Sequence, residues 1–269
     1  MDNAPRGGRA SERSHVHGKA FKGKERWRRA EETPQGGLGL SDRIKTYVKG
    51  LDTQLNGGIP AGSVVLVCGQ PGTMKSSLAY SILYQNALNE KVPSVYISLE
   101  QGSKSLRDNM SGLGLDHDKV QTVVGIQDLG MIRKKLKQVD KSTWYEVFKL
   151  TFKNFQDTWG AQLLCLDSLQ IFELMAKFQN PREDLFYFFE WLRDMNLTSF
   201  LLYEMKQGDQ SFGGFGEDFL ADGVVHLDLR REGNSVNLFL GVMKMRKTQH
   251  KRSYFPLLYE KDGFEVVVD

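Results

Sequence analysis

The sequence predicts an α/β fold whose central sheet is mainly parallel and flanked by helices, with antiparallel hairpins at its C-terminal end. Apolar runs of strand length alternate with segments of helical spacing, which is typical of a parallel sheet buried on both faces. A turn punctuated by glycines joins the first of these runs directly to a helical segment. Near the C-terminus, short strand-like segments are separated only by turn residues, which predicts hairpins.

Strands and helices alternate along most of the chain. Strands are predicted at residues 64–68, 94–99, 120–124, 162–167, 198–203, 223–229, 235–243, 255–259 and 264–268. Helices are predicted at residues 76–88, 103–112, 140–159 and from Asn180 onward. Asn180 and Pro181 fit a helix start at which Glu183 completes a capping box.

Two segments in the second half of the chain bear on where a functional site can lie. The helix at 140–159 carries one apolar stripe, which indicates core packing rather than a cofactor site. Its members are Trp144, Val147, Phe148, Phe152 and Phe155. Residues 206–217 contain four glycines and are predicted to form a mobile loop.

The turn after the first strand has the pattern of a phosphate-binding loop. It consists of Gly69, Gln70, Pro71, Gly72, Thr73, Met74, Lys75, Ser76 and Ser77. Backbone amides at the start of the following helix point into such a turn, and the helix dipole favours an anion there. We expect Lys75 to reach the β- and γ-phosphates of a nucleotide and the Ser76 hydroxyl to ligate magnesium. Met74 replaces the second glycine of the usual pattern, which predicts a slightly different loop path or weaker binding.

Two carboxylates follow predicted strands directly. Glu100 ends the strand at 94–99, and Asp167 ends the strand at 162–167. Ligands bind at the carboxyl ends of strands in an open parallel sheet, so Glu100 is a candidate to face the γ-phosphate. Asp167 follows the loop by about 90 residues and is presented as a magnesium-coordinating aspartate would be.

Composition divides the chain of 269 residues into a tail and one large domain. Residues 1–35 hold nine Lys and Arg against five Asp and Glu, although the whole chain carries only +3. We therefore expect a basic, disordered tail at residues 1–37 and one folded domain at 38–269, which the family resemblance described below implies is an ATPase domain. A solvated tail is the favoured interpretation, with contact to nucleic acid, an acidic partner or a membrane surface as alternatives.

The sequence also predicts a cytoplasmic protein that does not enter the membrane. It contains no apolar run of about 18 residues and no secretory signal at its start. Cys68 and Cys165 each lie within an apolar, strand-like run, which favours buried, reduced thiols.

Together these segments resemble the RecA-like ATPases, and within them the KaiC family in a single-domain form. The resemblance covers residues 39–268, nearly all of the predicted domain. It rests on Gly50-Leu51-Asp52 with Gly57-Gly58-Ile59-Pro60 and Gly62, the loop at 69–76, Glu100, Asp167-Ser168, the segment 219–225, and Lys244-Met245-Arg246 with His250. The archaeal recombinase RadA shares the earlier motifs, but the last two less clearly.

The resemblance implies an ATPase that hydrolyses ATP with Mg²⁺ at the subunit interfaces of a homo-oligomeric ring, usually a hexamer. The hydrolysis would drive a conformational or regulatory change, and the protein partner is unidentified. Glu100 would orient or activate the attacking water, and Asp167 would hold magnesium through water. Lys244 and Arg246 would reach from one subunit to the γ-phosphate bound by its neighbour; otherwise they form a solvated basic strand end. The family often has two glutamates where this chain has Glu100 and Gln101, so we expect slow hydrolysis. No segment matches the autophosphorylated region of the clock protein, and no clock role is predicted.

Two alternatives stay open at this point. A DNA-binding recombination or repair ATPase related to RadA would use residues 206–217, where Phe212 and Phe215 are available for base stacking. Nucleic acid is not favoured, because that loop offers only Lys206 against Asp209 and Glu217. The other alternative is a nucleotide-binding scaffold with little turnover, which Met74 and Gln101 motivate.

Overall fold

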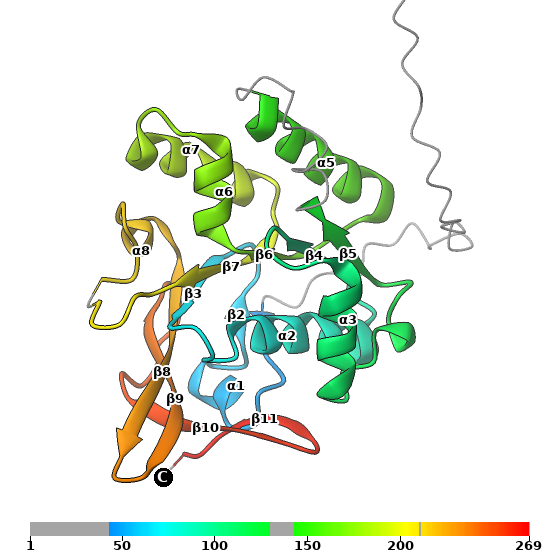
Figure 1. The fold of residues 1–269 in the computed structure, drawn as a ribbon. Coiled ribbons are helices and arrows are strands. Elements are labelled where there is room, and N and C mark those ends of the chain that lie inside the picture. The colour runs from blue at the N-terminus through cyan, green and yellow to red at the C-terminus, as the bar shows by residue number, and fades with distance from the viewer. Residues whose placement is uncertain (1–42, 130–142, 210, 269) are drawn as a thin grey trace, which may run out of the picture. The chain divides into compact units, whose positions relative to one another are not determined.

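A nine-stranded sheet lies at the centre of the computed structural model, which describes residues 43–129, 143–209 and 211–268 (Figure 1). Its strand order is β11-β10-β9-β8-β3-β7-β6-β4-β5. The strands are β3 (Val64–Gly69), β4 (Ser94–Ser98), β5 (Val124–Asp128), β6 (Leu163–Asp167), β7 (Thr198–Glu204), β8 (Gly223–Glu232), β9 (Ser235–Met245), β10 (Tyr254–Glu260) and β11 (Gly263–Val266). The six strands from β5 to β8 run parallel. Strands β9, β10 and β11 extend the sheet antiparallel, so the predicted fold class is confirmed.

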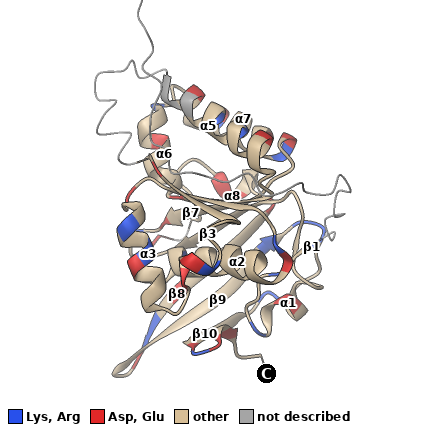
Figure 2. Ribbon diagram, turned by 90° about the vertical axis from the view of Figure 1, so that its right-hand side faces the viewer, with Lys and Arg blue, Asp and Glu red and all other residues tan. Residues whose placement is uncertain are grey.

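Helices cover both faces of this sheet. Helices α1 (Leu51–Gln54), α2 (Lys75–Glu90) and α3 (Ser103–Gly112) lie on one face, and α5 (Thr143–Trp159), α6 (Leu169–Ala176) and α7 (Pro181–Asp194) on the other (Figure 1). Each face has its own hydrophobic core: the first core lies under α1, α2 and α3, and the second lies under α5, α6 and α7. Side chains alternate along β3, so Val65 and Val67 pack into the first core, whereas Val64 and Leu66 pack into the second. Strand β3 carries no charged residue, as Figure 2 shows by its tan colour, because both of its faces are buried.

Short elements complete the described residues. They are β1 (Arg43–Ile44) paired with β2 (Ile59–Pro60), the 3₁₀ helix η1 (His117–Lys119) and helix α8 (Glu217–Leu220). The basic tail predicted at residues 1–37 lies outside the described residues, as do residues 140–142 of one predicted helix. No described helix is both long enough and apolar enough to cross a membrane.

The strand predicted at residues 120–124 is wrong in position. The carbonyl of Val120 accepts hydrogen bonds from the amides of Val123 and Val124, at 2.8 and 2.7 Å. These bonds close a turn, so Val120 cannot join a ladder and β5 begins only at Val124. Four of the five predicted residues therefore belong to the turn, and only Val124 lies in the strand.

The helical segments need two corrections. Helix α6 was not predicted, because its eight residues directly follow a strand end and only Leu169 and Phe172 are buried. At the start of α7, the amide of Asn180 donates to the Asp184 carboxylate at 3.1 Å. Glu183 instead accepts from the side-chain amide of Asn180 at 2.9 Å, so the predicted capping box does not form.

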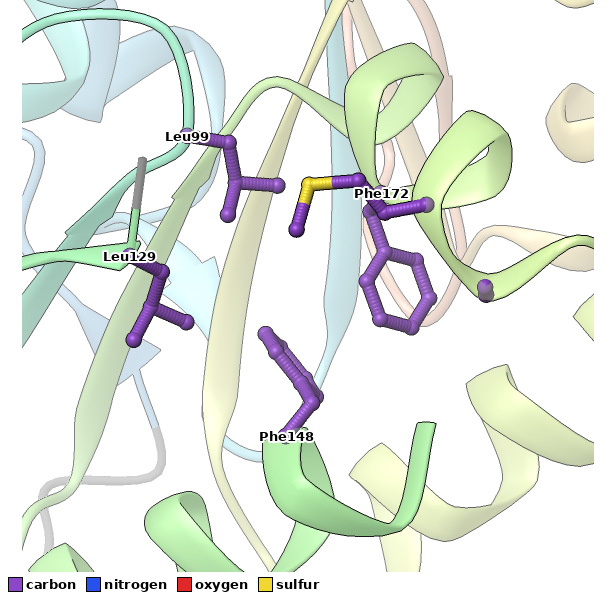
Figure 3. Close-up of a pocket in the computed structure, with 6 residues that line it drawn as sticks. Leu99, Leu129, Phe148 and Phe172 are labelled. Carbon is purple, nitrogen blue, oxygen red and sulfur yellow. The ribbon is translucent and has the colours of Figure 1, made fainter. Parts of the chain in front are cut away.

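The aromatic stripe on α5 packs into the second core, as predicted. Phe148 and Phe152 are fully buried, whereas the side chains of Trp144 and Val147 lie outside the described residues. A cavity of about 10 Å³ next to Phe148 is lined by apolar side chains of Leu99, Leu129, Phe148, Phe172, Met175 and Ala176 (Figure 3). It has room for one water at most and offers that water no polar partner, so no cofactor fits there.

Both cysteines lie inside the sheet. Cys68 and Cys165 are buried free thiols, as the sequence predicts. Burial raises the pKa of each thiol well above its ordinary value, which keeps both of them neutral.

Candidate functional site

The turn predicted to bind phosphate joins β3 to α2. Gly69 ends the strand, where an added Cβ would lie 2.6 Å from the Leu227 carbonyl oxygen and 2.6 Å from the Thr73 hydroxyl oxygen. No side chain larger than hydrogen fits at that position without a shift of the backbone. Gly72 has a φ of +83° and its side-chain direction is open for 4 Å, so the middle of the loop is uncovered. Helix α2 then starts at Lys75, with its first amides directed at the turn.

Met74 occupies the left-handed conformation for which glycine is the usual residue. Its φ and ψ are 62° and 25°, and it precedes the first residue of α2. Met74 therefore adopts the same backbone conformation as the usual glycine, although this conformation costs methionine about 1–2 kcal/mol more than glycine. Part of this cost is offset because the Met74 side chain packs against the first core.

The Lys75 side chain folds over the loop. Its ammonium group donates to the carbonyl oxygens of Gly69 at 2.9 Å and of Gln70 at 2.8 Å. Burial lowers the pKa of Lys75, and the nearby carboxylates of Glu204, Asp167 and Glu100 act in the opposite direction. The charged group thus lies at the mouth of the loop, where it would meet an anion.

Ser76 and Asp167 meet although 91 residues separate them. The Ser76 hydroxyl donates to Asp167 Oδ2 at 2.8 Å, and the Tyr96 hydroxyl donates to the same oxygen at 2.5 Å. The pKa of Asp167 is raised overall, because burial raises it by more than these two hydrogen bonds lower it. A hydroxyl and a carboxylate side by side are oxygen ligands of the kind Mg²⁺ takes. Tyr96 was not predicted from the sequence, although the hydroxyl of a tyrosine in a buried strand needs a hydrogen-bond partner.

Glu100 follows the neighbouring strand β4, two residues after Ser98, which pairs with Asp167. Its carboxylate is exposed and accepts a hydrogen bond from the buried Ser168 hydroxyl, next to Asp167 in the chain. The side chain of Gln101 turns away and donates to the Ser105 hydroxyl on α3 at 2.8 Å. The structure therefore gathers Lys75, Ser76, Asp167 and Glu100 at the carboxyl ends of β3, β4 and β6.

Lys244 and Arg246 lie at the opposite edge of the sheet, where the parallel strands β3 and β8 begin. Met245 is opposite Gly223, which is itself opposite Val65, four residues before Gly69 along β3. At 3.3 Å per residue, the backbone at Met245, between these two residues, is about 13 Å from Gly69 along the strand direction. The structure does not bring them to the site within one chain.

Both side chains are nevertheless held in place. The Lys244 ammonium donates to the carbonyl oxygens of Asp218, Phe219 and Ala221, at 2.9, 3.1 and 2.6 Å. Burial, followed by the charge of Arg246, lowers the pKa of Lys244. Arg246 donates to the Asp222 carboxylate at 2.9 Å, so these residues are not simply a solvated basic strand end.

The glycine-rich loop at 206–217 is anchored where the structure describes it. The fully buried Glu217 carboxylate accepts from the amides of Gly214 at 3.2 Å and Phe215 at 2.7 Å. Phe212 packs edge-on against His226, with ring centroids 5.1 Å apart. Only Phe215 of the two proposed stacking residues is exposed, so the loop offers less to a nucleobase than its sequence indicates.

A second carboxyl group, on Glu173, lies beside Glu217 and gives a pH-dependent prediction. Burial, and then the charge of Glu217, raise the pKa of Glu173 from 4.5 to about 8. The folded state therefore holds a proton that the unfolded state releases, and this stabilisation, complete below pH 4.5, is lost as the pH rises through about 8. We expect Glu173→Gln to be more stable than the wild type at pH 9 by about 1–3 kcal/mol and similar to it at pH 5. Thermal melts across this range check it, with the exposed Glu190→Gln on α7 as control; parallel curves for wild type and Glu173→Gln would contradict it.

Comparison with known proteins agrees with this geometry. A family model described as "ATPase: KaiC" matches residues 44–269. A UPF0273 protein of Aeropyrum pernix is 31% identical over 242 residues, covering 86% of this chain and 95% of its own. The circadian clock protein KaiC2 of Synechocystis is 25% identical, and the match covers 84% of this chain but 40% of that longer protein. The crystal structure of the KaiC-like protein PH0186 from Pyrococcus horikoshii superposes with a TM-score of 0.72 at 25% identity, covering 84% of this chain and 99% of that one.

Proposed function

Because this chain belongs to the KaiC ATPase family, we propose that it binds ATP with magnesium and hydrolyses it slowly at sites shared between subunits of a homo-oligomeric ring. The observation that carries the proposal is the convergence of Lys75, Ser76, Asp167 and Glu100 at one edge of the sheet. These residues come from three strand ends, and each has the chemistry that phosphoryl transfer to water requires.

The loop fits a nucleotide triphosphate. Residues 69–77 offer backbone amides and the positive end of the α2 dipole to the phosphates. Lys75 would exchange its two carbonyl partners for phosphate oxygens, which are stronger acceptors for an ammonium group. The left-handed backbone of Met74 supports this fit.

The oxygen ligands beside the loop fit a magnesium ion. Ser76 and Asp167 would hold it, and Tyr96 keeps the Asp167 carboxylate in one orientation. When bound, the ion would neutralise charge on the β- and γ-phosphates.

Glu100 is the residue that would act on the attacking water. As the water oxygen forms its bond to the γ-phosphorus, the bond from that phosphorus to the bridging oxygen breaks and ADP leaves. The proton of the water passes to the Glu100 carboxylate, whose orientation the Ser168 hydroxyl fixes. Catalysis otherwise consists of positioning and charge stabilisation.

The placement of Lys244 and Arg246 supports a site shared between subunits. They lie at the other edge of the sheet from their own loop, so we propose that they serve the loop of a second copy. A head-to-tail arrangement of this kind closes into a ring, for which we propose six subunits.

The test measures ATP turnover against protein concentration, together with the mass of the assembly, for the wild type and Arg246→Ala. We expect turnover per subunit to rise as the ring assembles. Arg246→Ala should bind ATP normally but lose about 10- to 100-fold in kcat, because Lys244 still supplies one cation. The exposed Arg252→Ala serves as control. ATP binding without turnover in any assembly would favour a nucleotide-binding scaffold, and turnover by a monomer would refute the shared site.

A further inference from the structure

The Asp222 carboxylate binds donors from three separate elements. Its Oδ2 accepts from the Val64 amide at the start of β3 and from Arg193 Nε on α7, both at 3.0 Å. Its Oδ1 accepts from Arg246 Nη1 just beyond β9, at 2.9 Å. The side chain is 13% exposed, so these bonds lie largely out of water.

The Asp222 carboxylate is ionised, and two positively charged guanidinium groups bind it. Burial alone would raise the pKa of Asp222, but the bonds from Val64, Arg193 and Arg246 outweigh it and lower that pKa. One negative charge is thus shared by two guanidinium groups. The cluster keeps a net positive charge at the edge of the sheet that also holds Lys244.

Arg246 is fixed at both ends. Its backbone amide donates to the Asp222 carbonyl oxygen at 2.8 Å, and its guanidinium binds the Asp222 carboxylate. The second amino group is 3.4 Å from the Phe219 carbonyl oxygen, a weak contact that leaves its donors available. The side chain is 52% exposed, so the guanidinium is held but accessible.

We propose that Asp222 is a positioning residue for the shared ATPase site, holding the Arg246 guanidinium in the orientation in which it meets the phosphates bound by the neighbouring subunit. The proposal rests on the proposed function above. A free arginine side chain loses rotamer entropy when it is immobilised, and the Asp222 contact removes part of that loss before the subunits meet. Preorganised charge of this kind raises the rate of the chemical step more than the affinity for substrate.

Asp222→Asn tests the proposal because it keeps the size of the side chain and removes its charge. We expect kcat to fall about tenfold, with the Kd for ATP unchanged within about threefold. Arg193→Gln is the matched control, since it removes the other guanidinium but leaves the pair of Asp222 and Arg246 intact. Its kcat should stay within about threefold of the wild type.

Rings that contain two variants separate positioning from a general structural role. Two differently tagged subunits are co-expressed and purified through both tags. In rings of Arg246→Ala with Glu100→Gln, roughly a quarter of the interfaces pair an intact nucleotide site with an intact Arg246, so activity returns. Asp222→Asn should regain activity in the same way with Glu100→Gln, but not with Arg246→Ala, because both of those variants damage the same side of the interface.

Each outcome bears on one of the two proposals. If Arg246→Ala is rescued and Asp222→Asn is not, Asp222 supports its own subunit and the positioning role is wrong. An Asp222→Asn variant with wild-type kcat overturns it equally. If Arg246→Ala itself is not rescued, the shared site fails and the proposed function fails with it. Should Asp222→Asn not fold, Asp222→Glu, which keeps the charge but displaces it, takes its place in the same rings.

Discussion

Glu100→Gln is expected to lower kcat for ATP hydrolysis by about 10²–10⁴-fold while changing the Kd for ATP with magnesium by less than about threefold. The amide keeps the shape of the side chain and still accepts the hydrogen bond from Ser168. It cannot take a proton from water at neutral pH, so only the chemical step loses its base. Phosphate release under saturating ATP measures kcat, and titration with a fluorescent nucleotide measures Kd.

Gln101→Ala is the matched control for this experiment. Gln101 is the next residue in the chain, but its side chain binds Ser105 on α3 rather than facing the site. We expect its kcat to stay within about twofold of the wild type. Equal losses in the two variants would mean that the turn after β4, not the Glu100 carboxylate, limits the rate. A Glu100→Gln variant that retains a tenth of the wild-type rate would remove Glu100 from the mechanism.

The parallel part of the fold was predictable because its strands are buried on both faces. Burial of both faces produces continuous apolar runs, and these runs place β3, β4, β6 and β7 within a residue or two of their observed positions. The run at 120–124 failed because an apolar sequence does not distinguish a buried turn from a buried strand. Helix α6 escaped prediction since a helix of eight residues has little room to show its period.

The geometry of the candidate site was predictable where its residues follow strand ends, and it was not predictable where the residues depend on packing. Lys75, Ser76, Glu100 and Asp167 each stand at the carboxyl end of a strand or in the turn that follows one, so topology alone brings them together. Tyr96 and Asp222 make contacts with residues 71 and 24 positions away, which no local pattern encodes. The carbonyl partners of Lys244 are equally invisible in sequence, because every residue has a carbonyl.

Lys75→Met is expected to weaken ATP binding by about 2–4 kcal/mol, which is roughly a 30- to 900-fold increase in Kd. Methionine has a similar length and no charge, so the loop keeps its volume and loses only the ammonium group. The effect on folding should be small, within about 1 kcal/mol, because two opposing changes nearly cancel. The variant loses the hydrogen bonds to Gly69 and Gln70 and is relieved of a partly desolvated charge.

Thermal melts with and without nucleotide separate these two effects. Without nucleotide, the wild type and Lys75→Met should unfold within about 4 °C of each other. At 1 mM ATP with magnesium, only the wild type and the exposed Lys104→Met control on α3 should gain stability as RT ln(1 + [L]/Kd) requires, here on the order of a few kcal/mol. An equal gain in Lys75→Met would show that the backbone amides and the α2 dipole alone hold the phosphates. Lys75 would then contribute to the transfer step rather than to binding, and its loss would appear in kcat.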